Sequence, residues 1–459
     1  MRNKVHIRRG TWLAVGLFGL TILMMPLDIF HIFTVMQRGI KPVWVAGTLF
    51  IASIAGLWFV QKRPVRFTSV AIALLLFNAA ALISALNLVD TGLSQWMDYV
   101  TVWVQLVFST FLVLGASQLS TSDRQVRFLI HIWLGLAFLL SLYALYQVLA
   151  RPLGWPFGYL PILNPSMAGD YIRGGRFGNF IRPSSVYAEP GFFGEFLLSP
   201  LILSWFLWFY HDQENVIFSE STVIGVMCLT IQAAFILSFS LAAWAALAGA
   251  ILIGAFDRYT REPLLKLTGV MLVSGVVLGF LFQPVLGDNF AEIAFVRTQE
   301  TVSNVLGQEK DTAEQATRYD QNSAGNRLAR ARASFDVWWN HPWTGVGLNN
   351  HHYYFPDHVA PEAHIGMLMV LSNMGLIGLS GFLCIFWCAF SLLRTLRNTV
   401  QPFSTEWLVS TGIQYALWAL VCKLMVGFNW VNVELWITLS MLVVVYRWGL
   451  ENEGDPGDC

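Results

Sequence analysis

Charged residues are scarce in this chain. Asp, Glu, Lys and Arg make up 12% of its 459 residues, whereas hydrophobic residues make up 56%. A water-soluble core of this size does not need so apolar a composition. The formal net charge is +0 and no long basic run occurs, which argues against a nucleic-acid partner. The composition therefore predicts a membrane protein.

Cysteine is also rare, with five residues in the whole chain. Cys228, Cys384, Cys388 and Cys422 lie within apolar runs and Cys459 ends a polar tail, so we expect no disulfide. Cys384 and Cys388 share a helix face, but neither histidine nor further cysteine lies beside them. They are better explained as packing residues than as metal ligands.

What the chain has instead is apolar runs of about 20 residues, the length that crosses a bilayer as a helix. We count about twelve. They begin near Thr11, Val43, Phe67, Tyr99, Phe128, Phe192, Ser221, Leu241, Leu265, His364, Trp407 and Val431. The sequence predicts an all-α, polytopic membrane protein whose residues 1–459 form a single membrane domain.

Basic residues give the orientation, because cytoplasmic loops are rich in Lys and Arg. Arg2, Lys4, Arg8 and Arg9 precede the first span and place this end in the cytoplasm. Alternate counting then gives the cytoplasm Lys62, Arg63, Arg66, Arg124, Arg127, Arg258, Arg261, Lys266, Arg394 and Arg397. Both chain ends are expected there. The outer side receives two larger segments, residues 151–185 and residues 284–362, the second between the ninth and tenth spans.

The first outer segment is a local cationic surface. It contains Arg176 and Arg182 among few acids, and it leads to Glu189 at the mouth of the sixth span. Intramembrane acids usually face a bundle interior or a wet cavity. Glu189 is therefore a candidate site residue, whereas Glu195, about one and a half turns deeper, is as well explained as the structural partner of a buried arginine.

The second outer segment is expected to become helical near Ser323 or Asn326, either of which suits a helix N-cap. Small residues and a tryptophan share one face with Arg327, and Arg330 lies roughly 60° away from Arg327. Both arginines would then lie on or beside a packed face. A phosphate is one natural partner for such guanidinium groups. The alternative is a salt bridge to Glu189 or Asp336.

After that helix, residues 340–350 form an expected tight turn whose glycines permit positive φ or close backbone approach. His351, His352, His358 and His364 follow. Such density invites a zinc hypothesis with Asp357 or Glu362 as further ligands, but the spacing fits no metal signature. The first three are more simply interfacial polar residues.

His364 opens a hydrophobic run directly after the longest polar segment. The following helix can hold its imidazole rigidly at the water boundary, where it can exchange a proton near neutral pH. Lys423 and Glu434 lie inside the last two spans, on either side of a short outer turn. We expect them to pair across this hairpin, although Lys423 beside the cationic loops is also a candidate phosphate ligand.

Together these residues resemble a known family. Arg327, Pro342, Gly345-Val346-Gly347, Ala363-His364 and residues 371–378 (LSNMGLIG) match the loose motifs of the O-antigen ligase and polymerase family of bacterial membrane glycosyltransferases, and Arg176-Phe-Gly with Glu189-Pro190 adds to the likeness. The long outer loop between spans nine and ten is also this family's layout.

The resemblance implies a GT-C-like helical fold in the bacterial inner membrane with a periplasmic site. It implies an undecaprenyl-diphosphate-linked glycan as donor and a sugar hydroxyl, on a glycan or on lipid A core, as acceptor, without a metal ion or other cofactor. By position, His364 matches the family's essential histidine and Arg327 its loop arginine; Arg176 and Arg182 match arginines of the earlier loop.

The chain also departs from the family's pattern. Ile365 stands where an Asn usually follows the histidine, Asn373 where a Glu is usual, and Leu241 where an Arg commonly follows the serine. Residues 238–241 (SFSL) with Glu189-Pro190 look more like repeat-unit polymerases than like ligases.

We therefore expect Arg176, Arg182, Arg327, Arg330 and Lys423 to bind the donor diphosphate and stabilise it as the leaving group. His364, alone or together with Glu189, would position or deprotonate the acceptor hydroxyl. The apolar spans would hold the polyprenyl chain.

Three alternatives stay open. A ligase would use the same chemistry on lipid A core. A lipid-linked oligosaccharide flippase predicts functional charges in mid-membrane and inverted repeats, whereas here the charges gather on one face. The hypothesis of a zinc-dependent hydrolase rests only on the number of histidines. A partner that sets polymer length is also left open.

Overall fold

The computed structural model describes residues 2–27, 29–35, 38–62, 64–88, 91–164, 176–177, 180–210, 217–218, 220–286, 323–355, 365–427 and 430–452. Its α-helices are α1 (Arg2–Met24), α2 (Pro42–Gln61), α3 (Ser69–Ser84), α4 (Leu93–Ser117), α5 (Asp123–Leu153), α6 (Pro190–Phe209), α7 (Ser221–Leu237), α8 (Leu241–Gly254), α9 (Arg261–Leu286), α11 (Ser323–Asn340), α12 (Gly366–Thr399), α13 (Thr405–Val426) and α14 (Val433–Asn452).

Short elements complete this part of the chain. The 3₁₀ helices are η1 (Ala85–Leu88) and η3 (His351–Tyr354). Strand β1 (Phe33–Val35) pairs antiparallel with β2 (Arg38–Ile40), and β3 (Arg176–Phe177) pairs antiparallel with β4 (Phe180–Ile181).

The predicted all-α, polytopic membrane architecture is confirmed. Within the described ranges, nine helices are long and apolar enough to cross a membrane. The other predicted spans correspond to shorter apolar helices, Thr11–Met24, Ser221–Leu237 and Leu241–Gly254. A helix thus covers each span that hydropathy predicted, and the predicted loop helix begins at Ser323.

Local sequence explains the helix ends that flank the first outer segment. Helix α5 begins where the Ser122 N–H donates to Gln125 Oε1 at 3.0 Å, half of a capping box. It ends before Gly154, whose φ of 67° is a left-handed conformation that glycine adopts readily. Pro190 opens α6, where its missing N–H costs nothing. These ends fix where the chain leaves and re-enters the bundle.

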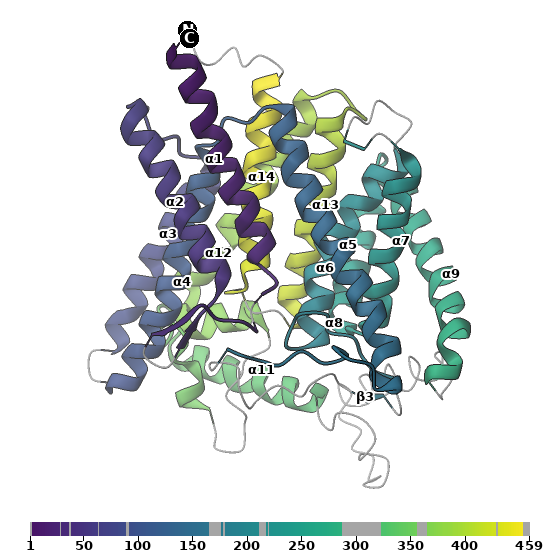
Figure 1. Ribbon diagram of the computed structural model, residues 1–459. Helices are drawn as coiled ribbons and strands as arrows, with labels where there is room; N and C mark the ends of the chain where they lie inside the picture. Colours follow the sequence, from purple (N-terminus) through teal and green to yellow (C-terminus); the bar gives the residue numbers. More distant parts are fainter. Residues whose placement is uncertain are drawn as a thin grey trace.

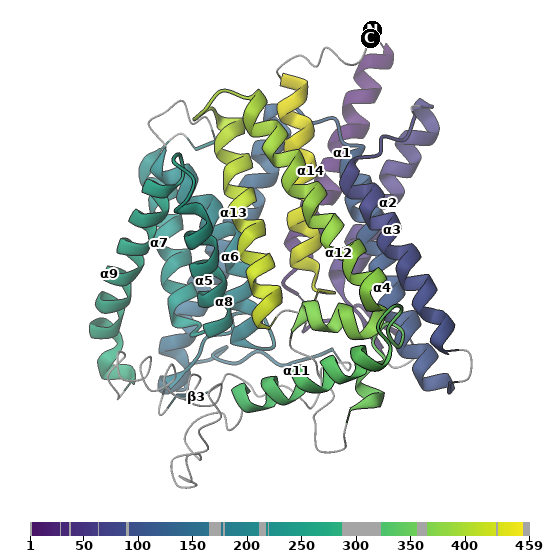
Figure 2. The same ribbon diagram turned by 180° about the vertical axis from the view of Figure 1, so that it is seen from behind.

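The helices run side by side in one bundle with two different ends (Figure 1). Helix α1 begins and α14 ends at one end, which we call the terminal side. The opposite end, the loop side, carries β1 to β4 and α11, which lies across the ends of the other helices (Figure 2). The described parts of both larger outer segments therefore share one side, as alternate counting predicted.

Burial separates a centre from a periphery. The apolar segments of α6, α14 and α13 are 83%, 72% and 67% buried, whereas those of α2 and α9 are 28% and 17% buried. Lipid tails are as apolar as these side chains, so close packing rather than exclusion from water holds the centre together. The central helices α6 and α13 also carry Glu195 and Lys423, which must find partners inside the protein.

Candidate functional site

Some predicted site residues lie beyond what the structure describes. His364 is outside the described residues, since that segment begins at Ile365. Arg176 in β3 and Arg327 in α11 have described backbones, but their side chains are outside the described part. The roles given to these three residues stay predictions.

Arg182 is 7% exposed and connects the first outer segment to another part of the fold. Its Nε donates to the carbonyl oxygen of Ser238 at 2.8 Å. Ser238 is the C-cap residue of α7, in the turn that leads to α8. The bond therefore ties residues 180–187 to the α7–α8 turn.

Arg151, in the last turn of α5, is a candidate that the sequence analysis missed. It is 9% exposed, and its Nε donates to Gly158 O at 2.8 Å, one terminal nitrogen to Ser184 Oγ at 3.1 Å, and the other to Arg182 O. Its guanidinium also lies 4.7 Å from the ring centre of Tyr159. All these acceptors are neutral, and no carboxylate of the described chain pairs with Arg151.

A sequence signal for Arg151 existed. It ends a span on the outer side, where the positive-inside rule makes arginine uncommon. Read in that way, an arginine at this helix end is a candidate for function rather than for orientation.

Gln147 holds the same turn from one helical turn earlier in α5. Its Oε1 accepts the N–H groups of Ser184 and Ser185 at 3.1 and 2.8 Å, and its Nε2 donates to Ser185 O at 3.0 Å. Ser185 needs this support, because its φ of 52° is unfavourable for a residue other than glycine. Gln147 and Arg151 together fix the backbone that carries Arg182.

Glu189 is the N-cap residue of α6 and is half-buried. One turn further, a Cβ added to Gly194 would lie 2.8 Å from Ser238 Oγ and 2.8 Å from Ser240 Cβ. The first turns of α6 therefore pack directly against the α7–α8 turn. The start of α6, the Arg182 side chain and the 238–240 turn meet at one place on the loop side.

The ion-pair partner of Lys423 differs from the one that the sequence predicted. Its Nζ lies 3.5 Å from Glu195 Oε2 and donates to Gly427 O at 2.6 Å, while Asn432 Nδ2 donates to Glu195 Oε1 at 3.1 Å. The ion pair that we expected with Glu434 is thus made with Glu195, because α6 packs against α13. Glu195 is a structural partner, of a lysine rather than an arginine. The role of Lys423 as a diphosphate ligand stays a prediction.

Helix α11 is amphipathic. Arg330 is 9% exposed and shares the inner face with Ala333, Ser334 and Val337, which are also buried. Asp336 is exposed on the opposite face. The structure thus places Arg330 on the packed side, as the helical spacing predicted.

The turn after α11, residues 340–350, forms backbone hydrogen bonds with a break in α12. We call this contact the hook. Gly375, inside α12, has φ 62° and ψ −162°, so helical hydrogen bonds are interrupted there. The loop replaces them: Val346 N–H donates to Ser372 O at 3.1 Å, and Leu376 N–H donates to Pro342 O at 2.9 Å. Gly345, with φ 64°, lies so close that an added Cβ would be 2.3 Å from the Asn373 carbonyl carbon. The prediction of close backbone approach in this turn is confirmed.

His351 lies behind this hook. It is 2% exposed, and its Nδ1 lies 2.9 Å from Asn373 Oδ1, which also accepts the His351 backbone N–H at 3.2 Å. Burial lowers the pKa of His351 to about 4, against the opposing effect of the Asn373 hydrogen bond. Because Oδ1 is an acceptor, we assign the proton of the neutral ring to Nδ1.

The expectation that His351 is an interfacial polar residue is therefore wrong. Asn373, which stands where the family usually has Glu, is its buried partner. His352 is half-buried, with Nε2 3.8 Å from Asp98 Oδ2. The remaining residues of the zinc hypothesis, His358, His364, Asp357 and Glu362, lie outside the described chain.

This arrangement provides cations where the spans open to the loop side. Buried guanidinium groups stabilise negative charge that develops near them more strongly than they would in water. A carboxylate, Glu189, begins the neighbouring helix. These groups suit the transfer of a group from an anionic donor.

A family model described as O-antigen ligase matches residues 224–383. The matched region runs from α7 into α12 and includes α11 and the hook, whereas Arg151, Arg182 and Glu189 precede it. No curated protein matches the chain. The family match confirms the resemblance drawn from the motifs. Residues 224–383 of this membrane protein are therefore similar to the O-antigen ligase family.

Proposed function

We propose that the protein is a repeat-unit polymerase of bacterial surface polysaccharide assembly. It transfers a glycan from an undecaprenyl-diphosphate-linked donor to a sugar hydroxyl at the periplasmic face of the inner membrane. The observation that carries the proposal is Arg151: a buried guanidinium held only by neutral acceptors, beside Arg182, on the side of the loops. Such a site attracts a multiply charged anion such as a diphosphate.

The reaction is an in-line displacement at the anomeric carbon. The acceptor oxygen forms a bond to this carbon as the bond to the diphosphate oxygen breaks, which inverts the configuration. The acceptor proton passes to a base, His364 or Glu189, and the leaving diphosphate keeps the electron pair. Arg151 and Arg182, with Arg176, Arg327 and Arg330, neutralise the charge that develops on it. The step needs no metal ion.

The choice of a polymerase rests on the polymerase-like pieces of sequence, which the fold brings near each other. The polymerase-like pieces of sequence, residues 238–241 and Glu189-Pro190, are about 50 residues apart, but Gly194 in the helix that Pro190 opens packs against Ser238 and Ser240. Arg182 binds the same turn. The pattern is thus one local structure, as expected if it forms one site.

The positions of the chain ends and of the arginines in the bundle support this orientation. The first helix begins and the last helix ends on the terminal side, where Arg258, Arg261 and Arg397 also lie. The positive-inside rule makes this side cytoplasmic. The loop side is then periplasmic.

The test is a transfer assay with purified protein and undecaprenyl-diphosphate oligosaccharide from its host, with and without a lipid A core acceptor, and with products resolved by size. A ladder without added acceptor is expected. His364→Ala should abolish it, whereas the matched variant His358→Ala should retain it.

Two results would overturn the proposal. A single product that forms only with lipid A core would make the protein a ligase. No transfer under either condition, with His364→Ala indistinguishable from wild type in the host, would favour a transporter.

A further inference from the structure

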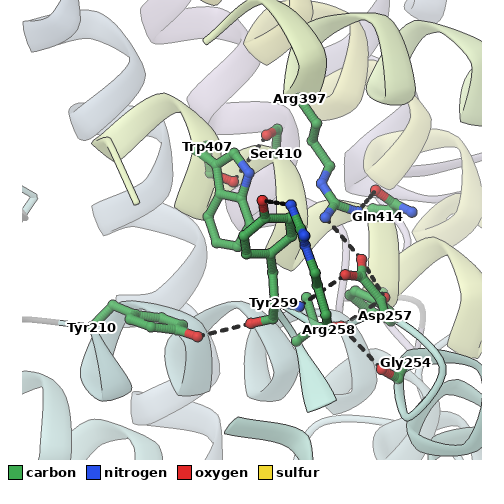
Figure 3. Close-up of polar contacts among 11 residues, drawn as sticks. Tyr210, Gly254, Asp257, Arg258, Tyr259, Arg397, Trp407, Ser410 and Gln414 are labelled. Carbon is green, nitrogen blue, oxygen red and sulfur yellow. Dashed lines mark hydrogen bonds and ion pairs between the residues drawn. The ribbon is translucent and has the colours of Figure 1, made fainter. Parts of the chain in front are cut away.

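A second cationic surface lies on the terminal side, away from the site above. It begins with a polar clamp on residues 255–260, between α8 and α9 (Figure 3). One Arg397 nitrogen donates to Asp257 Oδ2 at 2.8 Å, and the other donates to Gln414 Oε1 at 3.1 Å. Tyr210 Oη donates to Tyr259 O at 2.9 Å. Helices α6, α12 and α13 thus hold this turn in place.

The clamp uses Asp257 but leaves the neighbouring arginines without an acid. Arg258 lies with its guanidinium carbon 4.4 Å from the ring centre of Tyr259 and donates to the Tyr259 hydroxyl (Figure 3). Neither Arg258 nor Arg261 has a carboxylate partner in the part of the chain that the structure describes. Both side chains are exposed.

These arginines line a hollow of about 450 Å³, together with Glu262, Leu265 and Lys266. Lys266 and Glu262 neutralise each other, with Nζ 2.8 Å from Oε1. The hollow therefore has two uncompensated guanidinium groups, which can bind one phosphate through parallel N–H···O bonds.

An apolar surface starts at the same place. Helix α9 lies at the edge of the bundle (Figures 1 and 2), and its outer face exposes Leu265, Leu272, Val276 and Phe280 by 50, 69, 60 and 73%. Leu265 belongs both to this face and to the hollow. A molecule with a phosphate in the hollow would have its apolar part along α9.

We propose that this hollow is a binding site for an anionic phospholipid of the leaflet on the terminal side, which is cytoplasmic in the orientation given above. Charge selects the headgroup, since the hollow has a surplus of positive charge and zwitterionic lipids lack net negative charge. The clamp fixes the turn that carries Tyr259, and Arg258 contacts the Tyr259 ring, which reduces the entropy lost on binding. Basic pockets at the cytoplasmic ends of transmembrane helices suit such headgroups.

The test uses the full-length protein in mild detergent, titrated with phosphatidylglycerol or phosphatidylcholine, with bound lipid counted by native mass spectrometry. Wild type should bind phosphatidylglycerol more tightly than phosphatidylcholine. The double variant Arg258→Gln, Arg261→Gln should bind phosphatidylglycerol roughly thirtyfold more weakly, at about 1 kcal/mol for each lost cation. Its binding of phosphatidylcholine should not change.

The matched control is Arg124→Gln, Arg394→Gln, which removes the same charge from exposed positions on the same side but outside the hollow. An equal loss of binding in this control would mean that the overall positive charge of the terminal side binds the lipid. That result would overturn the proposal of a specific site in the hollow. Displacement of phosphatidylglycerol by equimolar inorganic phosphate would make the hollow a free-anion site instead. Equal affinity of wild type for both lipids would also overturn the proposal.

Discussion

Two arginines at opposite ends of the bundle, Arg397 and Arg151, are held in opposite ways. On the terminal side, Arg397 pairs with Asp257 at 2.8 Å and lies 5.4 Å from the ring centre of Trp407. On the loop side, Arg151 donates only to neutral oxygen atoms. A guanidinium that is paired with a carboxylate links helices but exerts little attraction on a further anion. A guanidinium that is held by neutral groups still attracts an anion. The comparison separates charges that stabilise the fold from charges available to a substrate.

The loop side depends on backbone contact as well as charge, and Gly375→Ala should break it most severely. An added Cβ would lie 2.2 Å from the Trp343 carbonyl carbon at a φ of 62°, so we expect a loss of about 3 kcal/mol or more in unfolding free energy. Thermal unfolding of the purified variant measures it. Gly381→Ala in the same helix is the control, because its Cβ would meet Phe77 at an ordinary 3.5 Å. Equal stability of both variants would contradict the hook.

Removing the charge of Arg151, which has no carboxylate partner in the described chain, should lower turnover. Arg151→Gln should lower the rate for each folded molecule roughly a hundredfold, the usual effect of losing one group that stabilises a developing anion. Arg151→Lys, which keeps the charge, should recover part of the rate, a result that a purely structural role does not predict. Initial rates at saturating donor, normalised to folded protein, make the comparison. Equal rates for the two variants would assign Arg151 to folding alone.

Some elements of this fold could be predicted from the sequence and others could not. Hydropathy located the spans, and spacing located α11 and the packed side of Arg330, because both patterns are periodic within one segment. The burial of Arg151 and of His351 was missed because it depends on which distant segment folds over each side chain. The partner of Lys423 was misassigned to Glu434 in the next helix. Hairpin neighbours are visible in a sequence, whereas the packing of α6 against α13 is not.

Removing the charge of Asp257, the acid that pairs with Arg397, should lower the stability of the protein rather than its turnover. Asp257→Asn leaves Arg397 without its acid, and we expect a loss of roughly 2 kcal/mol, less than for a fully buried pair because both side chains are partly exposed. Turnover for each folded molecule should stay near that of wild type. Chemical unfolding and the transfer assay on the same preparation test both statements. A large fall in turnover with unchanged stability would reverse the roles assigned to the two sides.

The smallest effect concerns pH and the buried His351 on the loop side. Its pKa of about 4 in the folded protein lies below the usual value of 6.5, because burial disfavours the charged ring. Between these values the unfolded chain binds more protons, so stability is complete above pH 6.5 and falls as the pH drops towards 4. The linked loss is roughly 1 kcal/mol near pH 5.5. His351→Gln should lack this part of the pH dependence, although His352, whose pKa burial also lowers, still contributes. Unfolding midpoints measured across this range for both proteins make the comparison, and parallel curves would show that folding does not lower the pKa of His351.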